Sequence, residues 1–215
     1  MKTDFLSGIR GMPAGIDDMQ DRAYEVLDRF SMRRVPRGGV KIVKILNGFG
    51  IKTYLDDIKP GSLYAYIVVD PALWEKFGTD RIACVNTALS DGDKRFALAN
   101  ELAHFLFDHD GSPAYMDAYV ADMTVKELRA DRFAACILMP EDVFREKYDE
   151  ISQSQLNPDT AGWLARYFRV SRDAVIKRLS GLRECDQGKL GIPTERMRDY
   201  RDDRGFHMPC KVHER

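Results

Sequence analysis

The spacing of apolar residues divides this chain of 215 residues into a helical beginning, a strand-rich middle and a helical remainder. Apolar side chains recur every three to four residues over 16–30 and over 40–49, which predicts two helices. Shorter segments rich in β-branched and aromatic residues then predict three strands, at 51–55, 63–69 and 81–86. Helical spacing returns and predicts further helices over 93–107, 125–138, 141–148, 160–168 and 172–182. This order of elements is typical of an α+β fold.

One predicted helix carries polar side chains in a regular row within an apolar segment. Asn100, His104 and Asp108 follow one another at intervals of four residues and therefore share one helical face, with Glu101 beside it. Two ligands one turn apart can point at a common metal ion, and a glutamate next to the first can act as general base on metal-bound water. The segment therefore has the layout of a zinc-peptidase helix.

The helix predicted over 125–138 supplies a second pair of side chains with this chemistry. Glu127 and Asp131 also lie four residues apart on one face. We expect the Glu127 carboxylate to reach the same metal as His104. We also expect Asp131 to accept a hydrogen bond from the far imidazole N–H of His104, which would orient the ring.

Two motifs resemble those of the ImmA/IrrE family of metallopeptidases. The segment RFALANELAHFLF is similar to the family pattern RFxxAHExxH, and KELRADRFAACILMP is similar to the pattern ExxxN/DxFAxxLLMP. The likeness extends over roughly residues 16–182. It implies a zincin-like metallopeptidase core with a small sheet, followed by a helix-turn-helix-like helical segment.

The same resemblance implies roles for residues and for the protein. Glu101 would be the catalytic base, His104 and Glu127 would bind zinc, and Asp131 would support a ligand by hydrogen bonding. Family members are cytoplasmic regulators that cleave a helix-turn-helix repressor at a specific site. That cleavage releases a phage or other mobile element from immunity control, or starts a stress response to DNA damage. The implied partner is therefore a repressor protein, and DNA is involved only indirectly.

The sequence departs from the family at the first metal-ligand position, where Asn100 replaces a histidine. An amide offers a weakly basic carbonyl oxygen in place of the imidazole nitrogen that zinc prefers. Loss of a residue that only supports a ligand costs ~10–100-fold in metal affinity, so loss of a ligand should cost more. We therefore expect zinc to bind weakly or not at all, and hydrolysis to be impaired or lost.

Three interpretations of Asn100 remain open on sequence grounds. It is a substitution that impairs an otherwise working endopeptidase, or it marks a pseudopeptidase that binds a repressor without cleaving it. In the third interpretation, a harder metal such as manganese or calcium uses oxygens of Asn100, Glu127 and Asp108 together with His104. The sequence alone therefore leaves open whether the chain is an active enzyme.

The strand predicted at 63–69 closely precedes the candidate helix. Peptidases of the zincin type commonly hold substrate as an added strand along a sheet edge, where main-chain hydrogen bonds provide affinity. We expect this strand either to form such an edge or to be an ordinary core strand.

The chain divides by pattern into a peptidase domain at 1–150, a helical segment at 151–184 and a polar tail at 185–215. The helices at 160–168 and 172–182 enclose a tight turn, and Ser171 is a suitable N-cap for the second helix. With Arg172, Lys177 and Arg178 on the later helix, a DNA-binding regulator is the rival class. Few basic residues and a net charge of -1 favour a packing or docking role instead.

Composition adds limits on location. Apolar residues make up 44% and charged residues 31% of the chain, as in ordinary globular proteins. No apolar stretch approaches the ~20 residues needed to span a bilayer, and the beginning of the sequence lacks the apolar core of a signal peptide. The four cysteines are scattered, which suggests reduced thiols in the cytoplasm. We expect His109 at a solvated helix end, and we attribute the spacing of Cys185, His207, Cys210 and His213 to chance.

Overall fold

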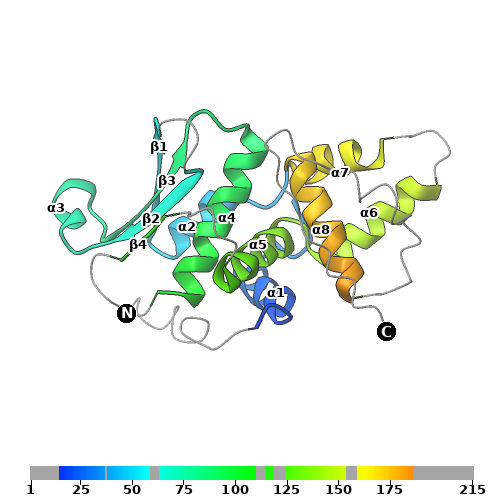
Figure 1. Ribbon diagram of the computed structural model, residues 1–215, viewed down its shortest axis with the longest axis horizontal. Helices are drawn as coiled ribbons and strands as arrows, with labels where there is room; N and C mark the ends of the chain where they lie inside the picture. The colour runs from blue at the N-terminus through cyan, green and yellow to red at the C-terminus, as the bar shows by residue number, and fades with distance from the viewer. Residues whose placement is uncertain are drawn as a thin grey trace. The chain divides into compact units, whose positions relative to one another are not determined.

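The computed structural model describes residues 15–36, 38–58, 63–109, 115–118, 124–153 and 159–185. Within these ranges the predicted α+β fold is confirmed (Figure 1). The elements in chain order are α1 (Met19–Arg29), α2 (Ile42–Gly48), β1 (Lys52–Asp56), β2 (Ala65–Val69), α3 (Leu73–Phe77), β3 (Arg81–Asn86), α4 (Asp91–Phe107), β4 (Tyr115–Ala118), α5 (Val125–Leu138), α6 (Glu141–Gln153), α7 (Thr160–Phe168) and α8 (Arg172–Cys185). Only α3 and β4 were not predicted from the sequence.

The sheet has the strand order β1-β3-β2-β4 in the described residues. Strand β1 runs parallel to β3, whereas β2 is antiparallel to both β3 and β4. The segment 63–69 therefore contributes an interior strand, and of the two roles left open for it, the substrate-binding edge is wrong. The reason is the short strand β4, whose pairing with β2 the sequence pattern did not indicate.

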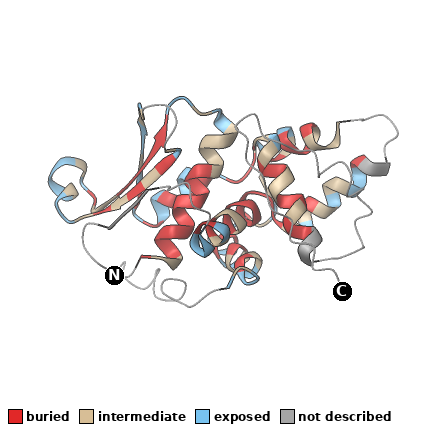
Figure 2. Cartoon of the chain, in the orientation of Figure 1, coloured by how far each residue is buried: buried red, intermediate tan, exposed pale blue. Residues whose placement is uncertain are grey.

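Helix α4 is the central element, because it packs on β2 and β3 on one side and on α5 on another (Figure 1). Its beginning is fixed by Ser90, whose hydroxyl accepts a hydrogen bond from the Asp93 amide at 3.2 Å. From Ala97 to Leu106 every residue of α4 is buried (Figure 2). The polar residues of this stretch are therefore enclosed between helices, where each needs a partner.

Helices α7 and α8 form the predicted helix-turn-helix-like pair. The turn between them places Arg169 in the left-handed region, with φ 55°. Ser171 is the predicted cap, since its hydroxyl accepts a hydrogen bond from the Ala174 amide at 3.3 Å. Residues 1–181 group into one compact unit, which includes α7 and most of α8.

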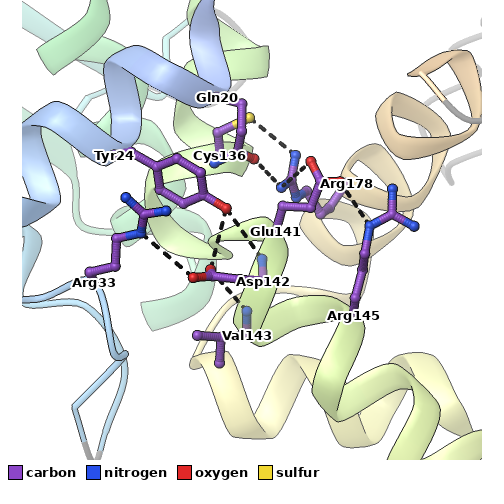
Figure 3. A network of polar contacts seen from close by, with 9 residues as sticks. All are labelled: Gln20, Tyr24, Arg33, Cys136, Glu141, Asp142, Val143, Arg145 and Arg178. Atoms are coloured by element: carbon purple, nitrogen blue, oxygen red, sulfur yellow. Dashed lines mark hydrogen bonds and ion pairs between the residues drawn. The ribbon is translucent and has the colours of Figure 1, made fainter.

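A buried arginine connects α8 to α1, α5 and α6 (Figure 3). Arg178 is only 2% exposed. Its guanidinium contacts the Cys136 sulfur at 3.1 Å, donates to the Gln20 carbonyl oxygen, and lies 3.9 Å from a Glu141 oxygen. Arg178 was a candidate for DNA contact in the sequence, but the structure uses it to fix α8 in place.

Two further expectations concern thiols and membranes. Cys84 and Cys136 are buried thiols that are not joined in a disulfide, and burial raises the pKa of the Cys84 thiol. The tail cluster of His207, Cys210 and His213 lies outside the described residues, as does the side chain of Cys185. None of the described helices combines the length and apolar character that a bilayer crossing requires.

Candidate functional site

The structure brings His104 of α4 and Glu127 of α5 together. The Nε2 atom of His104 lies 3.3 Å from an oxygen of Glu127, and both side chains are almost completely buried. Thr124 caps α5 and accepts a hydrogen bond from the Glu127 amide at 3.2 Å, which fixes the first turn of the helix. An imidazole and a carboxylate from distant parts of the chain thus meet at one point, as their spacing predicted.

The other nitrogen of His104 faces Asp108, one turn further along α4. The Nδ1–Oδ2 distance is 2.9 Å, and the second oxygen of Asp108 pairs with Arg129. Burial on its own would raise the pKa of Asp108, but the hydrogen bond from His104 and the charge of Arg129 hold that pKa below its ordinary value. Because an ionised carboxylate only accepts hydrogen bonds, Nδ1 is the donor in the contact with Asp108, and Nε2 is the ring atom that faces Glu127.

Asp108, and not Asp131 as expected, is therefore the carboxylate that orients the His104 ring. The sequence suggested Asp131 as the hydrogen-bond acceptor for His104 and Asp108 as an extra metal ligand. In the structure Asp108 lies behind the imidazole, on the side away from Glu127, and both of its oxygens are engaged there. The exchange follows from the orientation of α4 against α5, which residue spacing within either helix does not determine.

Asp131 instead contacts Asn100 and a lysine from α8. Asn100 donates from its amide nitrogen to one oxygen of Asp131 at 3.1 Å. Lys177 donates to the other oxygen at 2.6 Å, and its ammonium lies 4.9 Å from the centre of the Phe96 ring. In the rival interpretation of the sequence, Lys177 would contact DNA. No local sequence signal indicated this contact, because 46 residues separate the two partners.

Two other polar residues complete the buried part of α4. Glu101, the candidate base, is 5% exposed and lies within one turn of both Asn100 and His104. His109 is 6% exposed, and its ring lies 6.0 Å from that of Phe105. The expectation that His109 lies at a solvated helix end is therefore wrong, because the chain after α4 keeps this residue against the core.

Comparison with known proteins identifies the family to which this arrangement belongs. The family model of the IrrE N-terminal-like domain, peptidase family M78, matches residues 48–180. The chain belongs to the M78 family.

The match includes α4, α5 and all six candidate residues, so the M78 chain has a metallopeptidase-like domain. A search of solved structures finds a Mycobacterium tuberculosis transcriptional regulator with 18% identity and a TM-score of 0.48. The alignment covers 84% of this chain and 53% of the other, so the chain spans about half the length of that regulator. None of the curated proteins matches the sequence significantly.

The M78 family generally depends on zinc, and one pair of side chains has suitable geometry for it. Two ligands of a tetrahedral zinc ion, each at ~2.0–2.1 Å, lie roughly 3.3 Å apart. The measured separation of His104 Nε2 and the Glu127 oxygen is 3.3 Å. This pair could therefore occupy two corners of a zinc site.

The residue at the third corner of the tetrahedron is a poor zinc ligand. A catalytic zinc ion has three protein ligands, and the third position here is Asn100, whose amide nitrogen is directed at Asp131. Across the described ranges, no three His, Cys, Asp or Glu side chains are arranged to hold a metal ion. The residues present therefore do not fit a catalytic zinc ion.

Proposed function

We propose that this M78 chain is a metallopeptidase-like regulator that engages a helix-turn-helix repressor, and that its hydrolytic activity is impaired or lost because Asn100 replaces a zinc ligand. The observation that carries the proposal is the hydrogen bond from Asn100 to Asp131. In this proposal, the Asn100 amide stands where a catalytic zinc ion needs its third protein ligand, while His104 and Glu127 keep their convergent geometry.

The site supports loss of hydrolysis more than use of another metal. Manganese and calcium prefer oxygen ligands, and the sequence offered Asp108 as one of them. Both oxygens of Asp108 are engaged by His104 and Arg129, on the side of the imidazole away from Glu127. A site for a harder metal would therefore lack that carboxylate.

The rival function, direct DNA binding through α7 and α8, is disfavoured by the partners of its basic residues. Arg172 pairs with Asp159 at 2.7 Å, Lys177 pairs with Asp131 at 2.6 Å, and Arg178 is buried. Each cation that the sequence suggested for phosphate contact is thus used within the chain. We expect the purified protein to show no salt-dependent retention of duplex DNA.

The proposal is tested with the purified chain and the helix-turn-helix repressors of its own genome, expressed and purified one by one. Binding is measured by co-elution in size-exclusion chromatography, and cleavage by gel electrophoresis with added zinc. We expect the chain as it stands to bind the repressor without cleaving it. Asn100→His is expected to bind equally well and to cleave.

The matched control is the double variant Asn100→His with Glu101→Gln, which should bind and not cleave. Cleavage by the unaltered chain at the rate of Asn100→His would overturn the assignment of Asn100 as an inactivating residue. Absence of repressor binding by both proteins would overturn the regulatory part of the proposal.

A further inference from the structure

A cavity in the described part of the chain lies away from the candidate site. Its volume is about 730 Å³, and it is lined by parts of α2, β1, β3, the first half of α4 and the end of α7. None of the six candidate site residues lines it. A cavity of this size is in the range of ligand sites, and it requires an explanation separate from hydrolysis.

The cavity, which we call the basic groove, is rich in cations. Lys41, Lys94, Arg95, Arg166 and Arg169 line it, whereas Asp91 is the one acidic residue among the described residues of its wall. Clustered like charges with few counter-charges repel one another and favour an anionic ligand.

Two of these cations are close enough to affect each other. Burial lowers the pKa of Arg95, and the charge of Arg169 lowers it further. Arg95 donates to the Val40 carbonyl oxygen at 2.6 Å, but its Nε atom is buried without a hydrogen-bond partner. For Lys94, Arg95 and Arg169 the described residues supply no carboxylate as an ion-pair partner. The fold therefore holds these three cations close together with no carboxylate among the described residues paired to them.

The groove also follows an edge of the sheet. Thr53, Tyr54 and Leu55 of β1 all line it. Side chains of successive strand residues point to opposite faces, so three consecutive residues can border one cavity only where it lies along the strand edge. Strand β1 pairs with β3 on one side and forms an outer strand of the described sheet.

The same edge exposes apolar side chains. Leu55 is 68% exposed and Tyr54 36%, and Val43 of α2, which also lines the groove, is 42% exposed. An open strand edge with apolar side chains is a surface on which an extended segment can add by main-chain hydrogen bonds. A small anion would use the cations but would leave this apolar edge uncovered.

We propose that the basic groove binds an extended segment of a partner protein in which acidic and apolar residues alternate, added as a strand along the edge of β1. The acidic side chains face the lysines and arginines of α4 and α7, and the apolar ones, which point to the opposite face of the added strand, cover Tyr54. This role does not depend on a metal ion or on the candidate site.

The test uses a fluorescent peptide of about six alternating Glu and Val residues, the length of a typical strand. Binding to the full chain is followed by fluorescence anisotropy. Two further peptides accompany it, one with Lys in place of Glu and one with the Glu sequence and alternate amides N-methylated. ATP and single-stranded oligonucleotides are added as competitors. We expect the Glu peptide to bind, and the Lys and N-methylated peptides to bind at least about tenfold more weakly.

A charge-reversal variant locates the binding. Lys94→Glu combined with Arg166→Glu should weaken binding of the Glu peptide at least about tenfold, because acidic side chains then face each other. The matched control, Lys44→Glu with Lys76→Glu, makes the same change in net charge at exposed positions that do not line the groove. It should bind as the unaltered chain does. Thermal unfolding of each variant checks that the fold is retained.

Several results would overturn the proposal. These are no binding of the Glu peptide, equal binding of the Glu and Lys peptides, equal binding of the N-methylated peptide, or equal binding by both double variants. Tight binding of ATP or an oligonucleotide that displaces the peptide and is lost in Lys94→Glu with Arg166→Glu would assign the groove to nucleotides instead. Failure of repressor binding leaves these outcomes unaffected, so the two proposals are tested independently.

Discussion

At the level of single residues, the contact between Asn100 and Asp131 is the feature on which the proposed loss of hydrolysis rests. A histidine at position 100 could donate from one ring nitrogen to Asp131 and direct the other toward the point where His104 and Glu127 meet. An asparagine that donates its amide nitrogen to Asp131 has only a neutral carbonyl oxygen left. Asp131, which could support an imidazole at position 100, is thus present, whereas the imidazole itself is replaced by an amide.

This contact predicts that Asn100→His binds zinc. We expect about one zinc ion per chain after dialysis, and an affinity more than about 100-fold above that of the unaltered chain, because an imidazole is a far better zinc ligand than an amide. Metal content is measured by mass spectrometry and affinity by competition with a chelator. Adding Glu127→Ala to Asn100→His should remove the metal. A metal-free Asn100→His protein with an intact fold would show that the three side chains do not converge as proposed.

Residue spacing predicted part of the site and missed the rest for a physical reason. Positions four apart on one helix gave the rows of α4 and α5, and the meeting of His104 with Glu127 followed from them. Whether Asp108 or Asp131 reaches the imidazole depends on how the two helices are rotated against each other, which their own sequences do not specify. Lys177 comes from a third helix, so its contact with Asp131 depends on tertiary packing alone.

At the scale of elements, the beginning of α4 packs against the turn between α7 and α8. A Cβ atom at Gly92 would lie 2.5 Å from the Ser171 amide nitrogen and 2.6 Å from the Val170 carbonyl carbon. These are backbone atoms, which cannot move aside as a flexible side chain can. The close approach of two elements therefore requires glycine at this position.

Gly92→Ala is accordingly predicted to destabilise the fold, although alanine is the better helix former. We expect a loss of about 1–3 kcal/mol in the free energy of unfolding, as for other overpacked positions. Urea unfolding followed by circular dichroism measures it. Gly15→Ala is the control, because its Cβ would make only an ordinary contact at 3.6 Å. A Gly92→Ala protein as stable as the control would show that the turn can move away.

Asp159 links the starts of α7 and α8 through its charge. It accepts from the Gly162 amide at 2.9 Å and from Arg172 at 2.7 Å, and these two contacts, the amide first, lower the pKa of Asp159 from its ordinary 3.8. A lowered pKa in the folded state means that the ionised carboxylate stabilises the fold above the unfolded pKa. That contribution is lost as the pH falls through the folded pKa.

We therefore predict that Asp159→Ala lowers the melting temperature at neutral pH, and that the difference from the unaltered chain shrinks as the pH falls below about 4. Asp159→Asn should lose less, because asparagine remains a good N-cap although it cannot pair with Arg172. Thermal melts over a pH series measure both variants. A difference that grows on acidification would contradict the direction of the pKa shift.

The fold could be predicted where elements are long and amphipathic. The helices of the second half and three strands were predicted within a few residues of their observed bounds. Helix α3 has five residues and no buried side chain, so it has no apolar period to recognise. Strand β4 has four residues, and its pairing with β2 is what converted the predicted edge strand into an interior one.

At the scale of the whole molecule, Arg178 connects the helix-turn-helix-like pair to the helices of the metallopeptidase-like domain. Its partners come from α1, α5 and α6, so α8 cannot leave without exposing a buried cation and breaking these contacts (Figure 3). Lys177 ties the same helix to Asp131 in the candidate site. We infer that α7 and α8 unfold together with α4 and α5 rather than as a separate module.

Two tryptophans allow this inference to be tested at two places, because Trp74 lies on α3 beside the sheet and Trp163 lies on α7. In Trp74→Phe and Trp163→Phe proteins, the remaining tryptophan should report the same urea midpoint, as expected for one cooperative unit.

Arg178→Ala should lower the free energy of unfolding by about 3 kcal/mol, because it removes one partner from a buried polar cluster. Arg145→Ala, which removes a partly exposed partner of Glu141 at 2.8 Å, should change the free energy of unfolding by less than about 1 kcal/mol. If Trp163 reports an earlier transition than Trp74 in the unaltered background, the helical pair is a separate module, and Arg178 does not couple it to the site.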